Sequence, residues 1–448
     1  YKPPADSPEM KYMAERRAAM GGYVPARRRK GNELTVPELS AFENMFAATG
    51  DREISTTMAF VRILSTLVRD KQVGKYIVPI VPDEARTFGM EGMFRQLGIY
   101  SSVGQLYEPQ DNDQVMFYKE SKDGQILEEG INEAGAFSSW IAAATAYSVS
   151  GTQMIPFYIF YSMFGFQRIG DLAWAAGDSR ARGFVLGATA GRTTLNGEGL
   201  QHEDGHSHLM SATIPNCVSY DPTFGYELAV IIQEGMRRMV QNQEDVYYYI
   251  TLMNENYSHP EMPKGSEAGI LKGMYKFSQS KAKGPKVQLM GSGVILREVI
   301  AAAELLEKDW GVSADVWSVT SFTELRREGL DTERWNMLNP DKKAKQSYVE
   351  ECLSKTEGPV IASTDYMKSF GDQIRNFVPG RFVSLGTDGY GRSDSREALR
   401  SFFEVDRYYV VLAALKALAD EGKLPASKAA EAIKKYKIDA SRPNPTTV

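Results

Sequence analysis

Apolar residues along the first half of the chain follow two spacings in turn. The stretch ISTTMAFVRILSTLVRD (54–70) places them at helical spacing, and KYIVPIVPDEAR (75–86) follows with a short apolar run that ends in acids. The same order recurs as a helix rich in small residues at 130–148 and buried strands at 154–162, 182–191, 216–222 and 245–252. Apolar strands that alternate with helices predict a mostly parallel sheet covered on both faces.

A second series of this kind begins at KGPKVQLMGSG (283–293) and continues through 294–311, 314–321, 358–366 and 381–389. The Gly, Lys and Ser residues of 276–286 bury little and mark a boundary between the two series. We therefore predict an α/β protein with two consecutive, mostly parallel-sheet domains. The predicted parts are a linker and basic extension over 1–50, a first domain over 51–270 and a second over 271–448.

Composition and charge exclude several classes of protein. With 43% hydrophobic and 24% charged residues and a net charge of -5, the 448 residues are typical of a soluble globular chain. The basic run at 27–30 is flanked by proline and glycine, so we interpret it as a solvated linker and expect no nucleic-acid partner. Cys217 and Cys352 lie far apart, which indicates a reducing compartment and predicts a cytoplasmic protein.

The chain also lacks the sequence signals of a membrane protein. No apolar run reaches the roughly 18 to 20 residues that span a bilayer, so we expect no membrane association. The start YKPPADSPEM has none of the features of a signal peptide. It is Pro-rich and lacks an initiator methionine, which predicts that the chain is the later part of a longer polypeptide.

Residues with functional side chains follow the predicted strands. Ligands of open α/β sheets bind beyond the carboxyl ends of strands. Asp83 and Glu84 follow the first strand, residues 161–168 the next, and Asp221 a later one. The run GLQHEDGHSH (199–208) carries three of the four histidines, and it is compatible with a metal site, a catalytic site or a polar loop.

Glu133 stands at the start of the small-residue helix, between Gly130 and Gly135. A carboxylate is favoured there by the helix dipole, so the residue is either a helix-capping acid or a functional acid. The residue types alone leave both interpretations open.

Five long blocks of sequence resemble one known family. They are VPDEARTFGMEGMFRQLGIY, EEGINEAGAFSSWIAAATAYS, FYIFYSMFGFQRIGDLAWAAGD, GRTTLNGEGLQHEDGHSH and LGTDGYGRSDSREALRSFFEVD. Together they resemble the thiamine-diphosphate-dependent decarboxylating component of the pyruvate dehydrogenase complex in its homodimeric bacterial form, and more distantly the transketolases. The resemblance runs from about residue 50 to near the end. It implies a pyrimidine-binding middle domain followed by a transketolase C-terminal-like domain.

The resemblance also implies which residues meet the cofactor, thiamine diphosphate. Glu133 matches the glutamate that protonates the aminopyrimidine ring, and Phe164 matches the residue that stacks on it. Ile131 matches a further cofactor contact, and Arg168 a residue that orients the acids or the loop. The cofactor itself carries the difficult chemistry.

The same transfer implies the substrate contacts. Tyr161 and His202 match positions that face pyruvate and the adducts formed from it, where each can donate a hydrogen bond. His206 and His208 are then expected to hold the shape of their loop. Asp83 and Glu84 match acids near the dimer axis, hydrogen-bonded toward the activating glutamates, that could pass a proton between the two active sites. The implied reaction is oxidative decarboxylation of pyruvate with transfer of the acetyl group to a lipoyl carrier.

One signature of thiamine enzymes is missing from this sequence. Their diphosphate is held through magnesium at a GDG followed downstream by Asn, and neither TDGYGRSDS (387–395) nor EDGHSH fits that pattern. We therefore expect no metal ligand here and place the magnesium ligands in an N-terminal domain outside this chain, which either precedes it in a longer polypeptide, the interpretation we favour, or is a separate chain. The chain by itself is then predicted to bind the cofactor poorly and to be inactive.

The expected partners are a second copy in a homodimer, pyruvate, and the lipoyl-bearing dihydrolipoyl acetyltransferase component. Three alternatives stay open at this point. They are transketolase-like ketol transfer, an inactive dimerising fragment, and a metal hydrolase that uses the histidine-rich run 199–208, which we call the histidine loop.

Overall fold

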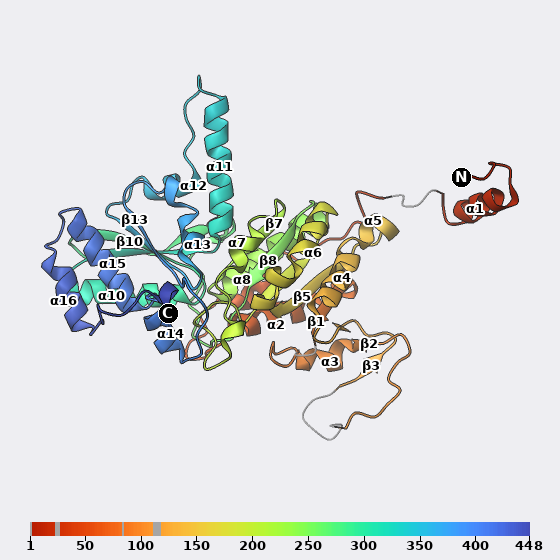
Figure 1. Ribbon diagram of the computed structural model, residues 1–448, viewed down its shortest axis with the longest axis horizontal. Coiled ribbons are helices and arrows are strands. Elements are labelled where there is room, and N and C mark those ends of the chain that lie inside the picture. The colour runs from red at the N-terminus through yellow and green to blue at the C-terminus, as the bar shows by residue number, and fades with distance from the viewer. Residues whose placement is uncertain (1, 23–26, 83–84, 111–117) are drawn as a thin grey trace.

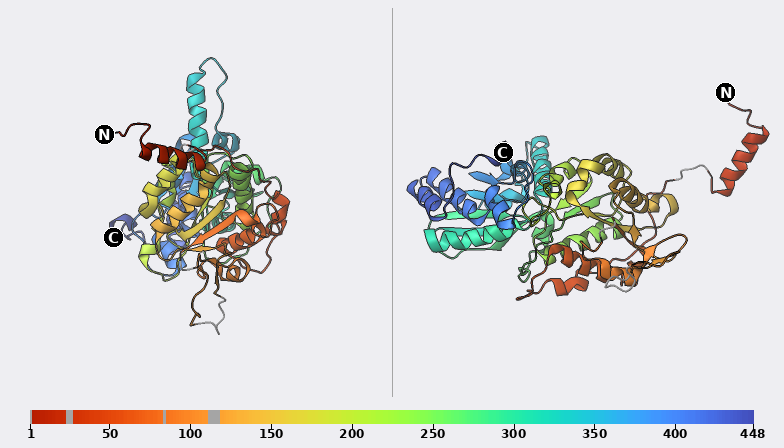
Figure 2. Two further views of the ribbon diagram at one scale, coloured as in Figure 1. Left: turned by 90° about the vertical axis from the view of Figure 1, so that its right-hand side faces the viewer. Right: turned by 60° about the horizontal axis from the view of Figure 1, so that its bottom comes forward.

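The computed structural model describes residues 2–22, 27–82, 85–110 and 118–448. Two α/β halves lie side by side along the long axis of the molecule, and α11 stands out from the second half (Figures 1 and 2). Each half is built on its own sheet. This arrangement confirms the predicted fold class of two consecutive, mostly parallel-sheet domains.

The sheet of the first half contains six parallel strands among the described residues, in the order β4-β1-β5-β6-β8-β7. Its central strands carry almost only apolar and aromatic side chains, which suits strands that are covered on both faces. The strands are β1 (Ile77–Val81), β4 (Leu127–Glu128), β5 (Ile155–Tyr161), β6 (Phe184–Ala188), β7 (Cys217–Tyr220) and β8 (Tyr247–Thr251); β2 (Ile99–Tyr100) and β3 (Glu120–Ser121) form a separate pair.

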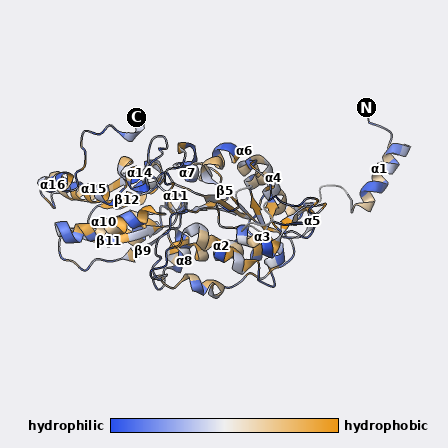
Figure 3. Cartoon of the chain, turned by 90° about the horizontal axis from the view of Figure 1, so that it is seen from below, coloured by the Kyte–Doolittle hydropathy of each residue, from blue (hydrophilic) through white to orange (hydrophobic). Residues whose placement is uncertain are grey.

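Helices cover both faces of this sheet (Figure 3), with α4 and α6 on one side and α2 and α8 on the other. The start of α2 follows local rules, because the Ser55 hydroxyl accepts a hydrogen bond from the Met58 N–H at 3.1 Å. The helices of this half are α1 (Pro8–Ala19), α2 (Thr56–Leu67), α3 (Glu91–Leu97), α4 (Glu133–Ala144), α5 (Ala146–Ser150), α6 (Phe166–Asp178), α7 (Ser207–Ser211), α8 (Gly225–Met236) and α9 (Glu267–Lys272).

The sheet of the second half has the order β13-β12-β10-β11-β9, and β9 alone among these described strands runs antiparallel to its neighbour. Its strands are β9 (Met274–Ser278), β10 (Lys286–Gly291), β11 (Ser313–Val319), β12 (Val360–Ser363) and β13 (Phe382–Leu385). Its helices are α10 (Ile295–Trp310), α11 (Phe322–Leu338), α12 (Tyr348–Leu353), α13 (Lys368–Asp372), α14 (Arg396–Phe402), α15 (Arg407–Asp420) and α16 (Ser427–Lys435).

The two halves share an apolar core and backbone contacts. One continuous group of buried apolar side chains includes Phe157 of the first half and Leu289 of the second. The Asp221 N–H at the end of β7 donates to the Thr320 carbonyl at 2.8 Å, directly after β11. The carboxyl ends of strands from both sheets therefore meet at the junction of the halves.

The later part of the segment 1–50, predicted as a linker and basic extension, packs on the first half, whereas α1 has no buried residue and lies apart from it (Figure 1). The Arg28 N–H donates to the Ser148 carbonyl at 2.9 Å, and the Gly31 N–H donates to Gln243 Oε1 at 2.8 Å. Val36 and Phe42 are buried in the core. These partners lie more than a hundred residues away, so a window of polar and basic residues does not reveal them. No described helix combines the length and apolarity needed to cross a membrane.

Candidate active site

Glu133 lies in the first turn of α4, but it does not cap the helix. The cap is Asn132, whose side chain accepts a hydrogen bond from the Gly135 N–H at 3.0 Å. The Glu133 carboxylate instead accepts a hydrogen bond from Arg168 Nη1 at 3.0 Å, and 18% of its side chain is exposed. The helix-capping interpretation is therefore wrong, and the carboxylate can engage a ligand.

Three predicted site residues meet through their rings. Tyr161 ends β5, Phe164 follows three residues later, and His202 belongs to a short 3₁₀ helix, η4 (Leu200–His202). The His202 ring lies 4.9 Å from the Tyr161 ring and 4.8 Å from the Phe164 ring, with edge-to-face geometry in both pairs. The fold thus joins residues that are about forty positions apart in the sequence.

Arg168 connects this aromatic group to the acid. Its guanidinium carbon lies 4.1 Å from the centre of the Phe164 ring, a cation–π distance, while the same group pairs with Glu133. Ile131, two residues before α4, is 72% exposed and presents an apolar surface beside Glu133. The structure therefore brings together five predicted residues and leaves Ile131 at their edge. Asp83 and Glu84 lie outside the described residues.

The His208 side chain connects the histidine-rich run 199–208 to both halves of the protein, through Thr251 and Phe370. His208 is buried, its Nε2 lies 3.0 Å from Thr251 Oγ1, and its ring stacks on Phe370 at 4.8 Å. Burial lowers the pKa of His208 to about 4. The Asp204 carboxylate accepts from the backbone N–H groups of His206 and Ser207. Within the described ranges, no group of three His, Cys, Asp or Glu side chains has the arrangement of a metal site.

Two parts of the chain match models of known protein families. Residues 34–260 match the pyruvate dehydrogenase E1 component middle domain, and residues 273–406 match the transketolase-like C-terminal domain. The chain belongs to the pyruvate dehydrogenase E1 family. The resemblance inferred from the sequence blocks is confirmed.

Curated relatives agree with this family. The pyruvate dehydrogenase E1 component of Pseudomonas aeruginosa is 68% identical over 447 residues, covering 99% of this chain and 51% of that protein. The E1 component of Escherichia coli K12 is 57% identical over 445 residues, covering 99% and 50%. The chain spans about half the length of the curated relatives it matches.

Solved transketolases share the fold of this E1 chain. A Pichia stipitis transketolase in complex with sedoheptulose-7-phosphate superposes with a TM-score of 0.61 at 16% identity, covering 93% of this chain and 51% of that one. A split-gene transketolase, described as an inactive beta4 tetramer, gives 0.54 at 15% identity and covers 82% of this chain and 98% of that one.

The E1 histidine loop is held by the C-terminal domain, which sequence reasoning missed. The Gly197 N–H donates to the Asp394 carbonyl at 2.8 Å, and the Met367 N–H donates to the Gly205 carbonyl at 2.9 Å. Glu203, fully buried, accepts from the Arg392 N–H at 2.6 Å. The segment TDGYGRSDS (387–395), which does not fit the magnesium-binding pattern, thus contacts the candidate active site. Its closely spaced glycines were the available signal for a close backbone approach.

Burial raises the pKa values of two acids where the histidine loop meets the C-terminal domain. It raises the pKa of Glu203 to about 8, against the opposing effect of the Arg392 N–H. It also raises the pKa of Asp365, after β12, to about 7. Neither acid was selected from the sequence, because nothing in a local window shows that it is buried.

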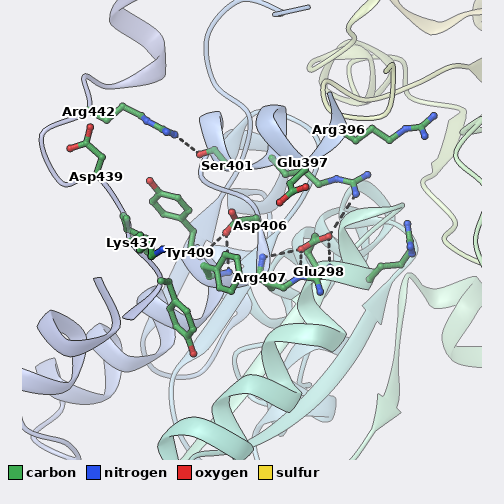
Figure 4. Close-up of a pocket in the computed structure, with 15 residues that line it drawn as sticks. Glu298, Arg396, Glu397, Ser401, Asp406, Arg407, Tyr409, Lys437, Asp439 and Arg442 are labelled. Atoms are coloured by element: carbon green, nitrogen blue, oxygen red, sulfur yellow. Dashed lines mark hydrogen bonds and ion pairs between the residues drawn. The ribbon is translucent and has the colours of Figure 1, made fainter. Parts of the chain in front are cut away.

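A second polar region joins the two E1 domains at some distance from the rings. A cavity of about 560 Å³ lies in the C-terminal domain between α10, α14, α15 and the chain end, and none of the predicted site residues lines it. Glu298 on its wall pairs with Arg407 at 2.8 Å and with Arg400 at 3.7 Å (Figure 4). Arg400 also pairs with Glu255, which follows β8 in the middle domain. Buried ion pairs thus link α10, α14 and α15 to the first half.

Proposed function

We propose that this chain supplies the aminopyrimidine half of the active site of a pyruvate dehydrogenase. The proposed reaction is the oxidative decarboxylation of pyruvate, with transfer of the acetyl group to the lipoyl group of a dihydrolipoyl acetyltransferase. The observation that carries the proposal is the carboxylate of Glu133. It stands at the start of α4 without a capping role and is linked through Arg168 to Phe164. The identity of 57–68% to proteins named pyruvate dehydrogenase E1 component supports the substrate.

The residues present fit the aminopyrimidine end of thiamine diphosphate. Such a ring needs a flat partner, which Phe164 provides, and an acid at the ring nitrogen, which Glu133 provides. The buried Ser162 hydroxyl beside them has no hydrogen-bond partner within the described part of the chain. Ile131 adds an apolar contact. When bound, thiamine diphosphate supplies the electron sink that lets a 2-keto acid lose carbon dioxide.

Each side chain then has a defined task. Glu133 holds a proton at the ring nitrogen of the aminopyrimidine, and Arg168 keeps its carboxylate in place. Tyr161 and His202 donate hydrogen bonds to the oxygen atoms of pyruvate, where negative charge develops. Phe164 backs the cofactor ring and contacts His202, which ties the cofactor face to the substrate face.

The diphosphate half of the site is expected outside residues 1–448. The sequence carries no GDG with a downstream Asn, so the magnesium ligands belong to another part of the full protein. We propose that the active form contains this other part, and that it is a full-length homodimer in the cytoplasm. The chain alone is expected to bind the cofactor weakly and to show no turnover. Asp83 and Glu84 stay candidates for proton transfer toward Glu133.

The test uses the full-length protein. With thiamine diphosphate, magnesium and an artificial electron acceptor, it should release labelled carbon dioxide from carboxyl-labelled pyruvate. Glu133→Gln should lower this rate more than 100-fold, because an amide does not exchange the required proton; the exposed Asp178→Asn on α6 is the control. Turnover of a ketose phosphate without turnover of pyruvate would support the transketolase-like alternative and refute the proposal.

A further inference from the structure

The turn that carries His202 is poorly anchored by its own residues. None of the three residues of η4 is buried, no side chain caps it, and Leu200 is 53% exposed. The His202 Nδ1 lies 3.4 Å from Glu198 Oε1, but it has no hydrogen bond within the described part of the chain. The position of the imidazole must therefore depend on neighbours outside the turn.

The middle domain supports only one side of the turn. Tyr161 and Phe164 contact the His202 ring edge-to-face, which limits the tilt of the imidazole. These two contacts involve the ring and do not fix the backbone of the turn. The opposite side faces the C-terminal domain.

On that side the two backbones touch directly. A Cβ atom placed on Gly391 would lie 2.5 Å from the Leu200 carbonyl oxygen and 2.9 Å from the Glu203 Cβ. Only glycine allows this approach, because every other residue would push the turn away. Gly391 therefore sets how far η4 can move toward the C-terminal domain.

The segment around Gly391 is itself fixed on both flanks. The guanidinium of Arg192, in the middle domain, donates to the Gly389 carbonyl. On the other side, a Cβ on Gly389 would lie 2.7 Å from the Pro445 carbonyl oxygen, so the chain end packs against it. The surface that meets η4 is therefore contacted by both the middle domain and the chain end.

Glu203 adds a hydrogen bond to the contact between Gly391 and η4. It follows His202 directly, its side chain is fully buried, and its Oε2 accepts the Arg392 N–H at 2.6 Å. A buried hydrogen bond to a fixed backbone N–H restricts both rotation and translation of the residue that carries it. The neighbouring His202 shares that restriction through one peptide unit.

We propose that Glu203 is a positioning residue for His202, through which the C-terminal domain holds the imidazole at the substrate. The Arg392 N–H and Gly391 are the two contacts that it uses. This role rests on the proposed function, since it assigns a purpose to the placement of a substrate-facing histidine. It also extends the proposal, because it makes the C-terminal domain part of the active site.

The first test is a double-mutant cycle in the full-length enzyme. Glu203→Ala should lower kcat for pyruvate about 10- to 100-fold with less than about a threefold change in KM, as expected for a misplaced group. Glu203→Gln keeps an oxygen acceptor for the Arg392 N–H and should restore most of kcat. In a His202→Asn background, Glu203→Ala should have little further effect. Additive losses in the cycle would show that Glu203 acts independently of His202 and overturn the proposal.

The second test does not depend on activity. Diethyl pyrocarbonate modifies accessible histidines, and peptide mass spectrometry gives the rate at His202, whose side chain is 18% exposed. Glu203→Ala and Gly391→Ala should both raise this rate several-fold, whereas Glu203→Gln should not. Gly92→Ala, at a glycine with no atom within 4 Å of an added Cβ, and Glu397→Ala, at an exposed acid on α14, are the controls.

The two tests separate the possible failures. An inactive wild type with an altered His202 modification rate in the variants would refute the proposed function and support the positioning role. An active wild type with unchanged rates in Glu203→Ala and Gly391→Ala would refute the positioning role alone.

Discussion

The guanidinium of Arg168 on α6 donates a hydrogen bond of 3.0 Å to the carboxylate of Glu133 on α4. Because 49% of the Arg168 side chain is exposed, water screens this pair and its contribution is modest. Its importance is geometric, since it fixes the direction of the acid that starts the proposed chemistry.

Arg168→Gln should raise the half-saturating concentration of thiamine diphosphate about two- to fivefold, which corresponds to the ~1 kcal/mol of an exposed ion pair. Arg168→Lys should give a half-saturating concentration between those of the wild type and Arg168→Gln, because lysine keeps the charge but not the planar contact with Phe164. The measurement is activity of the full-length enzyme against cofactor concentration. The control is Arg180→Gln, whose side chain is 50% exposed and pairs with Asp245 at 3.8 Å. An unchanged half-saturating concentration in Arg168→Gln would contradict the orienting role.

His202→Asn should lower kcat for pyruvate about 100-fold, with cofactor binding nearly unchanged. The imidazole meets Tyr161 on the proposed substrate side, contacts the cofactor-stacking Phe164 edge-to-face, and takes no part in the pairing of Glu133. His206→Asn, in the same loop, should stay within about twofold of wild type. Steady-state kinetics together with calorimetry of cofactor binding separates the two effects. Loss of cofactor affinity in His202→Asn would show that this residue belongs to the cofactor site instead.

Glu255→Gln should destabilise the domain junction by about 3 kcal/mol. The carboxylate pairs with Arg400 and also accepts a hydrogen bond of 2.5 Å from Arg297, so its loss removes the carboxylate partner of Arg297 and leaves Arg400 with the more distant Glu298 at 3.7 Å. The expected result is a lower midpoint of urea unfolding for this chain. Glu431→Gln, which removes an exposed pair with Lys428, should shift the midpoint far less. Equal shifts for the two variants would rule out a special role of the junction.

His259 should make the fold less stable as the pH falls from about 6.5 to 4, whereas the buried acids Glu203 and Asp365, whose pKa values are raised, act in the opposite direction. Burial lowers the pKa of His259 to about 4, and its Nδ1 accepts the Gly225 N–H at 2.9 Å, which only the neutral ring can do. The unfolded chain therefore binds the proton more readily, and the contribution of His259 to the free energy of unfolding falls by about 3 kcal/mol across this interval.

His259→Gln should reduce that pH dependence, since it removes the titrating group. The measurement is urea unfolding of both proteins at pH 7, 5.5 and 4. His206→Gln serves as the control variant. Parallel pH profiles for wild type and His259→Gln would show that other groups produce the acid sensitivity.

Several features of this protein could be predicted from local sequence. The alternation of apolar stretches led to two parallel-sheet halves, because the spacing of apolar residues that is typical of helices and buried strands can be read within a short window of sequence. The long blocks around Glu133, Phe164 and His202 indicated the E1 family, and those residues do meet in the structure. The prediction failed where the partner was distant. Nothing near residue 28 shows that Arg28 is bonded to Ser148.

The sequence by itself determined the elements, the family and the chemical groups of the candidate site. The tertiary structure alone decided how those groups are used. Asn132 rather than Glu133 caps α4, His208 is a core residue, and Glu203 meets Arg392 across nearly two hundred positions of chain. The physical reason is that the apolar pattern typical of a helix or a strand can be read within a few positions of the chain, whereas strand pairing, burial, pKa and hydrogen-bond partners are set only when distant segments and separate domains pack.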